Sequence, residues 1–475
     1  MKRMMTACLC VACLLLMAGA CAESNGRTVT ITYSPRPRII PTPAPTAAVA
    51  DTPSPAPVAQ EEAETIEIPV IRRRAPLELS ERIAARRAAQ ATPTDLATGT
   101  DLEQPVAEDL TMQCVINGYT TAQHLDKMRD GKYSTYWNSQ LINGAHQVTI
   151  VPPTGKRVYG VVVKWRSNPM PFAVQVENEE GEWVTVARSE AKFNEQYLAV
   201  PGVDEFRIVN ADNPRVKLQI CELTIIGEGA LPENVHVWQE PPAEVDMMLI
   251  AGHPDDEVLW FGGLLPYYAG ERQKSVLVVT AAYNIYYRKL ELLDCLWTCG
   301  VRIYPHFLNY EDFVTSDVYY TINRWGSSRC YHDFTILYRR YRPLVVVLQD
   351  SKGEYGHGIH KAVSRLGQLA VGYAADPQKY PTEQEKYPVW DVPKVYVHLY
   401  AENQITMDWH QPLSRFGGMT AQDVAREAYK CHVSQQHKEY YSVQDGGPYD
   451  NELFGLFHTV VGPDVAKNDL FENLE

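Results

Sequence analysis

Four short and almost purely apolar runs mark the second half of the chain. They are DMMLIAG (Asp246–Gly252), SVLVVT (Ser275–Thr280), LVVVLQD (Leu344–Asp350) and KVYVHLY (Lys394–Tyr400). Runs of this length and composition are typical of parallel strands that are buried on both faces, with helices between them. We therefore expect residues 245–475 to form an α/β domain with a Rossmann-like strand order. In such a sheet, ligands bind outside the carboxyl ends of the strands.

Two polar clusters follow two of these runs. HPDDE begins at His253, after the first run, and EYGHGIH ends at His360, after the third. His253, Asp256 and His360 offer two imidazoles and one carboxylate, and three such ligands hold a catalytic zinc while leaving a fourth position for water. Taken alone, the acidic cluster could be only a helix N-cap, and a single histidine is usually structural. Their coincidence at two strand ends favours a metal site.

The residues beside these three ligands predict hydrolysis of an amide. A catalytic zinc lowers the pKa of its bound water and polarises a carbonyl group. Asp255 lies next to one ligand in the sequence and is our candidate for the general base. His357 precedes His360 by three residues, so at the start of a helix the two would share a face. There His357 would stabilise the oxyanion or protonate the leaving amine, with Tyr355 as a second hydrogen-bond donor.

With these motifs, the chain from Val245 to near its end resembles the phosphatidylinositol-glycan class L (PIG-L), or LmbE-like, zinc deacetylases. The apolar strand followed by HPDDE is the most specific part of the resemblance. The resemblance implies zinc on the three ligands named above, a general base at Asp255 and an N-acetylglucosamine-type substrate. It also implies that His357 and Tyr355 assist the tetrahedral intermediate.

The chain departs from the family pattern in the second motif. The family often has HPDH where this chain has His357, Gly358, Ile359 and His360. The change keeps the zinc ligand but removes an aspartate that could orient or charge the neighbouring histidine. It is the one feature that favours a non-catalytic alternative, a cell-surface protein that only binds glycans. The intact ligands and base weigh against that alternative.

Two further residues are candidate substrate contacts. Arg288 could hold a sugar hydroxyl or a phosphate, and the alternative is an exposed pair with Glu291 on a helix. Asp312 is a weaker candidate of the same kind. Two histidines and one carboxylate also suit Fe2+, as in ferrous oxygenases, so Fe2+ is the alternative metal. The adjacent Asp255 favours hydrolysis, because an oxygenase has no evident need for it.

Between residues 111 and 228 the apolar residues alternate with polar ones. Five such runs are separated by turn residues: Arg157–Trp165, Phe172–Glu177, Glu182–Arg188, Glu205–Val209 and Lys217–Gly227. Short strands at this spacing predict an all-β sandwich. DGKYSTYW (Asp130–Trp137) and the closing LQICELTIIG resemble a discoidin-like, coagulation factor type C-like module with a jelly-roll fold. The resemblance implies a surface ligand such as a glycan, and a structural Ca2+.

Three tryptophans and two cysteines of this region have alternative roles. Trp137, Trp165 and Trp183 are either ligand platforms or core residues, and we expect two of the three in the core. Cys114 and Cys221 lie near the two ends of the region. They would pair in an oxidising compartment, and two free buried thiols are the alternative. Six of the ten cysteines lie after residue 22, and they show no spacing typical of a zinc knuckle.

The N-terminus predicts export. A positively charged start, an apolar run from Ala7 to Met17 and small residues after it follow the order of a secretory signal, here residues 1–22. The run is too short for an ordinary membrane span. Cys21 offers a lipid anchor, and so membrane or cell-wall association, as the alternative to simple cleavage. Residues 23–110 are dense in Pro, Ala and Thr and predict a mostly disordered linker, with a short helix after Ser80.

The formal net charge of −14 argues against a nucleic-acid partner, because phosphate binding needs clustered lysines and arginines. It fits a protein that handles neutral or cationic ligands. The sequence therefore predicts an exported, zinc-dependent deacetylase that acts on an extracellular or cell-surface amino sugar or glycan.

Overall fold

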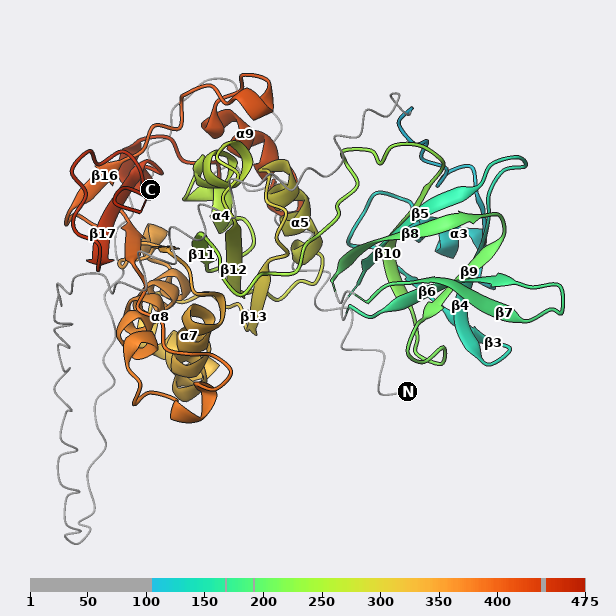
Figure 1. Cartoon of the computed structure of the whole chain (residues 1–475), viewed down its shortest axis with the longest axis horizontal. Helices are drawn as coiled ribbons and strands as arrows, with labels where there is room; N and C mark the ends of the chain where they lie inside the picture. Colours follow the sequence, from blue (N-terminus) through green and yellow to red (C-terminus); the bar gives the residue numbers. More distant parts are fainter. Residues whose placement is uncertain (1–104, 167–168, 191–192, 437–440, 475) are drawn as a thin grey trace, which may run out of the picture. The chain divides into compact units, whose positions relative to one another are not determined.

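The computed structural model describes residues 105–166, 169–190, 193–436 and 441–474, which all belong to one compact unit. The predicted leader, the predicted linker and the helix expected after Ser80 lie outside the described residues. In the described part of the chain, no helix is long and apolar enough to cross a membrane. The described residues form an all-β region and an α/β region (Figure 1).

Two antiparallel sheets make up the all-β region. One has the strand order β1-β4-β9-β6-β7 with β3 beside β4, and the other has the order β2-β10-β5-β8. The strands are β1 (Val115–Asn117), β2 (Trp137–Asn138), β3 (Gln140–Ile142), β4 (Ala145–Val151), β5 (Val158–Trp165), β6 (Phe172–Glu177), β7 (Trp183–Arg188), β8 (Glu195–Val203), β9 (Phe206–Asn210) and β10 (Gln219–Ile226). Each of the five predicted runs coincides with a strand to within a few residues, so the all-β prediction is confirmed. The jelly-roll and discoidin-like assignments stay predictions.

The apolar side chains between the two sheets form the core of this region. Trp137 and Trp165 are each 1% exposed in that core, whereas Trp183 is partly exposed on β7, beneath the guanidinium of Arg207. The expectation of two core tryptophans is therefore confirmed. Cys114 and Cys221 are both buried and free, so the alternative of two unpaired thiols holds.

A seven-stranded sheet forms the centre of the α/β region, in the order β13-β12-β11-β14-β15-β17-β16. The strands are β11 (Met247–Ala251), β12 (Val276–Ala282), β13 (His306–Tyr310), β14 (Val345–Leu348), β15 (Lys394–His398), β16 (Gln404–Thr406) and β17 (Leu453–Thr459). The first five strands in the sheet order are parallel, and β17 is antiparallel to both of its neighbours. The four predicted runs are the fully buried strands β11, β12, β14 and β15, which confirms the α/β prediction. The Rossmann-like assignment stays a prediction.

Helices cover both faces of this sheet. They are α4 (Asp256–Leu259), α5 (Arg288–Thr298), α6 (Val318–Trp325), α7 (Ser327–Tyr341), α8 (Gly358–Ala375) and α9 (Ala421–Tyr429), while α3 (Ala122–Leu125) belongs to the all-β region. Figure 1 shows α7 and α8 on one side of β11, and α4, α5 and α9 on the other. Because β11, β12, β13 and β14 are parallel neighbours, the loops that follow them leave the same edge of the sheet.

Candidate active site

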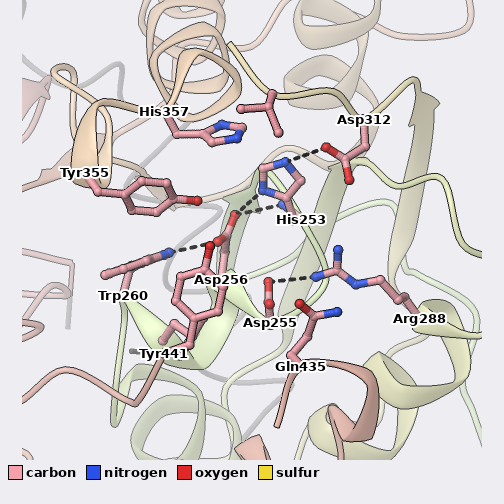
Figure 2. A pocket seen from close by; sticks show the side chains of 12 residues that line it. His253, Asp255, Asp256, Trp260, Arg288, Asp312, Tyr355, His357, Gln435 and Tyr441 are labelled. Atoms are coloured by element: carbon pink, nitrogen blue, oxygen red, sulfur yellow. Dashed lines mark hydrogen bonds and ion pairs between the residues drawn. The ribbon is translucent and has the colours of Figure 1, made fainter. Parts of the chain in front are cut away.

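The loops after these four parallel strands bring together all eight site residues predicted from the sequence. His253, Asp255 and Asp256 follow β11, Arg288 follows β12, Asp312 follows β13, and Tyr355, His357 and His360 follow β14. All of them except His360 line one pocket (Figure 2). His360 is fully buried beside it.

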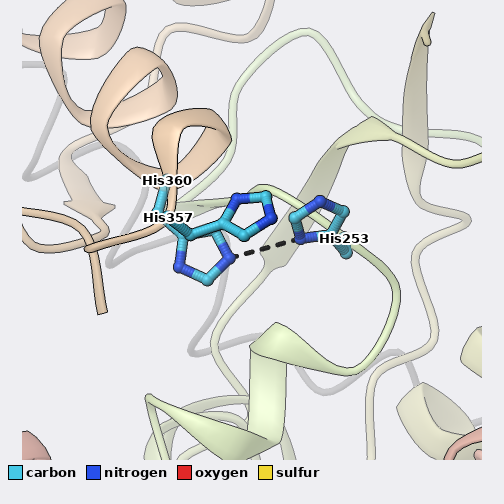
Figure 3. A group of neighbouring side chains, drawn as sticks. All are labelled: His253, His357 and His360. Atoms are coloured by element: carbon cyan, nitrogen blue, oxygen red, sulfur yellow. Dashed lines mark hydrogen bonds between the residues drawn. The ribbon is translucent and has the colours of Figure 1, made fainter. Parts of the chain in front are cut away.

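The three predicted zinc ligands form a triangle of donor atoms. His360 Nε2 and His253 Nδ1 lie 3.2 Å apart (Figure 3). Each of these nitrogens also lies 3.2 Å from Asp256 Oδ2. Ligand atoms of a tetrahedral zinc, each about 2.0–2.1 Å from the metal, are about 3.4 Å from one another. The residues present therefore fit a zinc ion.

His357 provides another ring nitrogen near the same place. Its ring centroid lies 4.9 Å from that of His253 and 4.8 Å from that of His360, and these three histidines are also close enough to share a metal ion (Figure 3). However, His357 Nδ1 accepts the backbone N–H of Ile359, at 3.2 Å, and so caps α8. Burial, with His253 and His360 nearby, lowers the pKa of His357 to about 3. The triangle with Asp256 is the tighter set of ligands.

Asp255 is a buried carboxylate with one cationic partner. Its Oδ1 lies 3.0 Å from Arg288 Nη2, which also donates to the carbonyl of Pro254. Asp255 has a φ of 121°, a conformation that L residues rarely adopt and that concentrates at functional sites. Burial raises the pKa of Asp255 to about 6, although Arg288 opposes this shift. A carboxylate with a pKa near neutrality suits a general base.

The structure gives both candidate substrate contacts a protein partner. Arg288 is buried against Asp255, and Glu291 instead accepts hydrogen bonds from Ser434. The alternative of an exposed Arg288–Glu291 pair is therefore wrong. Asp312 Oδ1 lies 3.3 Å from His253 Nε2, the ring nitrogen that faces away from the triangle. Asp312 is thus placed to orient a candidate zinc ligand, in addition to lining the pocket.

Sequence reasoning missed the side chains that hold the other two ligands. Trp260 Nε1 donates to Asp256 Oδ1, at 2.8 Å. Glu354 Oε2 lies 2.8 Å from His360 Nδ1, and its Oε1 lies 2.7 Å from His398 Nδ1. Burial would raise the pKa of Glu354, but these two hydrogen bonds lower it to about 2. The four-residue spacing of Asp256 and Trp260 is a signal that could have been used, whereas no local pattern pairs Glu354 with His398.

The pocket has an aromatic side and a polar side. Figure 2 shows Trp260, Tyr355 and Tyr441 on one side, and Arg288, Asp312 and Gln435 on the other. Sequence reasoning did not assign a role to Gln435 or Tyr441. Burial raises the pKa of Tyr355, so its hydroxyl stays protonated and able to donate.

One protein-family model matches the chain. It is described as PIG-L: GlcNAc-PI de-N-acetylase, and it matches residues 248–371. This segment runs from β11 to α8 and contains both polar clusters that the sequence singled out.

Two curated proteins are similar to the chain. The 1D-myo-inositol 2-acetamido-2-deoxy-alpha-D-glucopyranoside deacetylase 1 of Catenulispora acidiphila is 28% identical over 185 residues, which are 33% of this chain and 56% of that protein. The deacetylase 2 of the same name from Saccharopolyspora erythraea is 29% identical over 280 residues, 48% of this chain and 100% of that protein. The chain thus spans about half the length of the first relative.

Among solved structures, the N,N'-diacetylchitobiose deacetylase from Pyrococcus horikoshii is similar to 41% of this chain, over 72% of its own length, with 18% identity and a TM-score of 0.31. At this identity and score the likeness does not extend to activity or substrate. The family match and the two curated relatives support a deacetylase, an amide hydrolase, as the class of enzyme.

Proposed function

We propose that this chain is a zinc-dependent deacetylase that hydrolyses the acetamido group of an amino sugar or glycan. The observation that carries the proposal is the triangle of donor atoms from His253, Asp256 and His360, with the buried carboxylate of Asp255 beside it. The names of the two curated relatives, both deacetylases of a 2-acetamido-2-deoxy-glucopyranoside, support an N-acetylated amino sugar as the substrate.

The residues around the triangle supply the proton transfers of such a hydrolysis. A bound zinc would polarise the acetamido carbonyl and acidify a water molecule. Asp255 takes a proton from the attacking water as the new C–O bond forms, while Arg288 holds its carboxylate in place. When the C–N bond breaks, that proton passes to the leaving amine; the other product is acetic acid, which loses its remaining proton to solvent and leaves as acetate.

His357 acts in this proposal as a neutral hydrogen-bond donor to the oxyanion. With a pKa lowered to about 3 by burial, its ring is uncharged at neutral pH. Because Nδ1 accepts the N–H of Ile359, the single proton of the ring lies on Nε2. This favours oxyanion stabilisation over protonation of the amine. The hydroxyl of Tyr355 is the second donor.

The proposal is tested by acetate release from N-acetylglucosamine and its oligomers, with the full chain loaded with one equivalent of zinc. Asp255→Asn should keep the zinc and lose about 10²–10⁴-fold in kcat, because general base catalysis contributes that much. Acetate release by the wild type, together with its loss in Asp255→Asn, would also exclude the alternative that the chain only binds glycans. A chain that binds no zinc, or an Asp255→Asn variant with full activity, would contradict the proposal. Fe2+, which suits the same ligands, serves as the comparison metal.

We further propose that the chain is exported and acts outside the cell. The order of residues 1–22, a charged start followed by an apolar run and then small residues, supports this.

We also propose a structural Ca2+ in the all-β region. Asp130 Oδ1 and Glu222 Oε1 each accept the backbone N–H of Lys132, at 3.0 Å. Two carboxylates this close support a calcium site, since Ca2+ prefers such oxygen ligands.

A further inference from the structure

Helix α5 extends from the pocket towards the all-β region. Arg288, its first residue, pairs with Asp255. Glu291 lies one turn further along and accepts hydrogen bonds from Ser434 N and Oγ, at 2.8 and 2.6 Å. Asp294 is three residues beyond Glu291 on the same helix. The Arg288–Asp255 contact of the pocket and Asp294 thus belong to one helix.

The all-β region binds α5 at Asp294. Tyr133 donates its hydroxyl to Asp294 Oδ2 at 2.5 Å, and Lys164 Nζ lies 2.8 Å from Asp294 Oδ1. Lys164 is 13% exposed and also lies 3.2 Å from Glu195 on β8. Burial opposes the charge of Lys164, but Asp294 and Glu195 together raise its pKa. The amine is thus shared between a carboxylate of each region, and either carboxylate alone would leave it less well neutralised.

A second contact lies just before α5. Tyr286, two residues before Arg288, donates its hydroxyl to the carbonyl of Ser134, at 2.9 Å. Its ring meets that of Tyr136 edge-on, with 6.2 Å between the centroids. The guanidinium of Arg166 lies over both rings, 4.3 and 4.8 Å from their centroids. The start of α5 is therefore held from the all-β region by an aromatic pair and a cation.

The two regions also share apolar core. Phe193, which precedes β8, stacks on Tyr304 with 4.2 Å between ring centroids. Phe193 and Cys221 belong to the same hydrophobic cluster as the strands of the α/β region, and Tyr133 and Tyr136 pack against it. A module that merely spaced the enzyme would not share its core in this way.

Arg288 has few hydrogen bonds of its own. Its Nη2 makes the contacts to Asp255 and Pro254, while its Nε is buried and has no hydrogen-bond partner among the described residues. With so few contacts of its own, the guanidinium takes its position from the backbone of α5. A small movement of the helix would move it away from the carboxylate.

We propose that the all-β region is a positioning element of the active site: through Tyr133, Tyr136 and Lys164 it fixes α5, and thereby fixes Arg288 against Asp255. Tyr133 and Tyr136 touch no reacting group, so they are positioning residues. The catalytic consequence rests on the deacetylase function proposed above, whereas the mechanical consequence does not.

The mechanical part is tested by amide hydrogen exchange on the full chain. Tyr136→Ala removes the ring beneath Arg166, and Trp183→Ala is the matched control, because Trp183 lies beneath Arg207 at the same 4.3 Å but on β7. Tyr136→Ala should speed exchange at the start of α5, over residues 286–292, and Trp183→Ala should not. Unchanged exchange in Tyr136→Ala overturns the proposal. Tyr133→Phe, which removes only the hydroxyl bound to Asp294, replaces Tyr136→Ala if that variant does not fold.

The catalytic part is tested by a double-mutant cycle on kcat/KM. Tyr136→Ala should lower kcat/KM by about 10- to 100-fold, the effect expected of a displacement of about 1 Å in a catalytic group, with zinc content unchanged. In an Arg288→Ala background the same substitution should have no further effect, because it acts through Arg288. Losses that multiply overturn the proposal, since a general loss of stability would produce them. If the wild type releases no acetate, the proposed function fails while the exchange experiment still decides the positioning role.

Discussion

The two folded regions differ in how many charged side chains they bury. Among the described residues up to Gly227, the one buried acid or base is Glu195, which pairs with His236 and Lys164. The α/β region buries many, including His253, Asp255, Asp256, Glu257, Arg288, Glu291, Glu354, His360, His398 and His432. Burying a charge costs several kcal/mol unless it is paired, so a region accumulates such groups only where they neutralise one another.

This contrast follows from strand direction. In the α/β region four neighbouring parallel strands end at the same edge, so polar residues from four loops converge and can pair. In the all-β region neighbouring strands are antiparallel, their ends alternate between two edges, and the core between the sheets contains apolar side chains. The exception, Glu195, lies where this region contacts the α/β region. In the all-β region, buried charge therefore marks the contact with the α/β region.

The largest expected effect is on stability at Glu354. Glu354→Ala removes the carboxylate between His360 and His398, and breaking a buried ion pair of this kind costs about 3–5 kcal/mol in the free energy of unfolding. Urea unfolding measures it. The control is Glu108→Ala, which breaks the exposed pair with Lys156 in the all-β region and should leave stability unchanged. Equal losses in the two variants would contradict the comparison between the regions.

Zinc should stabilise the chain through the α/β region alone. At a free zinc concentration 100 times its Kd, the free energy of unfolding should rise by about 2.7 kcal/mol, and a chelator should reverse this. Calorimetry measures the shift in Tm. Asp256→Ala should abolish it, because it removes one atom of the triangle, while Asp130→Ala in the all-β region should retain it. A full zinc-dependent shift in Asp256→Ala would place the metal elsewhere.

The hydrogen bond from Trp260 should tune zinc affinity. Trp260→Phe keeps an aromatic ring in the pocket wall but loses the N–H that holds Asp256 Oδ1. Loss of such a supporting contact should raise the Kd for zinc about 10- to 100-fold, measured by competition with a chromogenic chelator. Trp183→Phe, the same substitution in the all-β region, should have no effect. An unchanged Kd in Trp260→Phe would mean that Asp256 needs no such support.

The smallest effect concerns Glu222 and pH. Burial, aided by Asp130, raises the pKa of Glu222 to about 7, above its ordinary 4.5. Because the folded state holds this proton more tightly, the stability that Glu222 contributes is present below pH 4.5 and is lost as the pH rises through 7. Glu222→Gln should therefore raise Tm by about 2 °C at pH 8 and leave it unchanged at low pH. The calcium site is tested with the same two proteins. Added Ca2+ should raise the Tm of the wild type at pH 8 but not that of Glu222→Gln. If the Tm of the wild type does not respond to Ca2+, the proposed calcium site is wrong.

Local patterns in the sequence were enough to predict the two kinds of fold and the members of the candidate site. Buried parallel strands have continuous apolar runs, and the clusters at His253 and His360 come soon after two of them. The sequence did not predict β13 and β17, because these strands are partly exposed and carry polar residues. It did not predict β8 either, because Pro201 and Gly202 interrupt the alternation of apolar and polar residues in this strand.

By itself, the sequence determined which residues could bind a metal and act on water, and that these lie at strand ends in an α/β region. Only the tertiary structure decided which partner each of them has. It paired Arg288 with Asp255, placed Asp312 on His253 and Glu354 between two histidines, and brought the all-β region against α5. Apart from Glu354 and His360, which are six residues apart, these pairings join segments that are far apart in the chain. They depend on the order of the strands in the sheet, which the local periodicity of a single sequence does not encode.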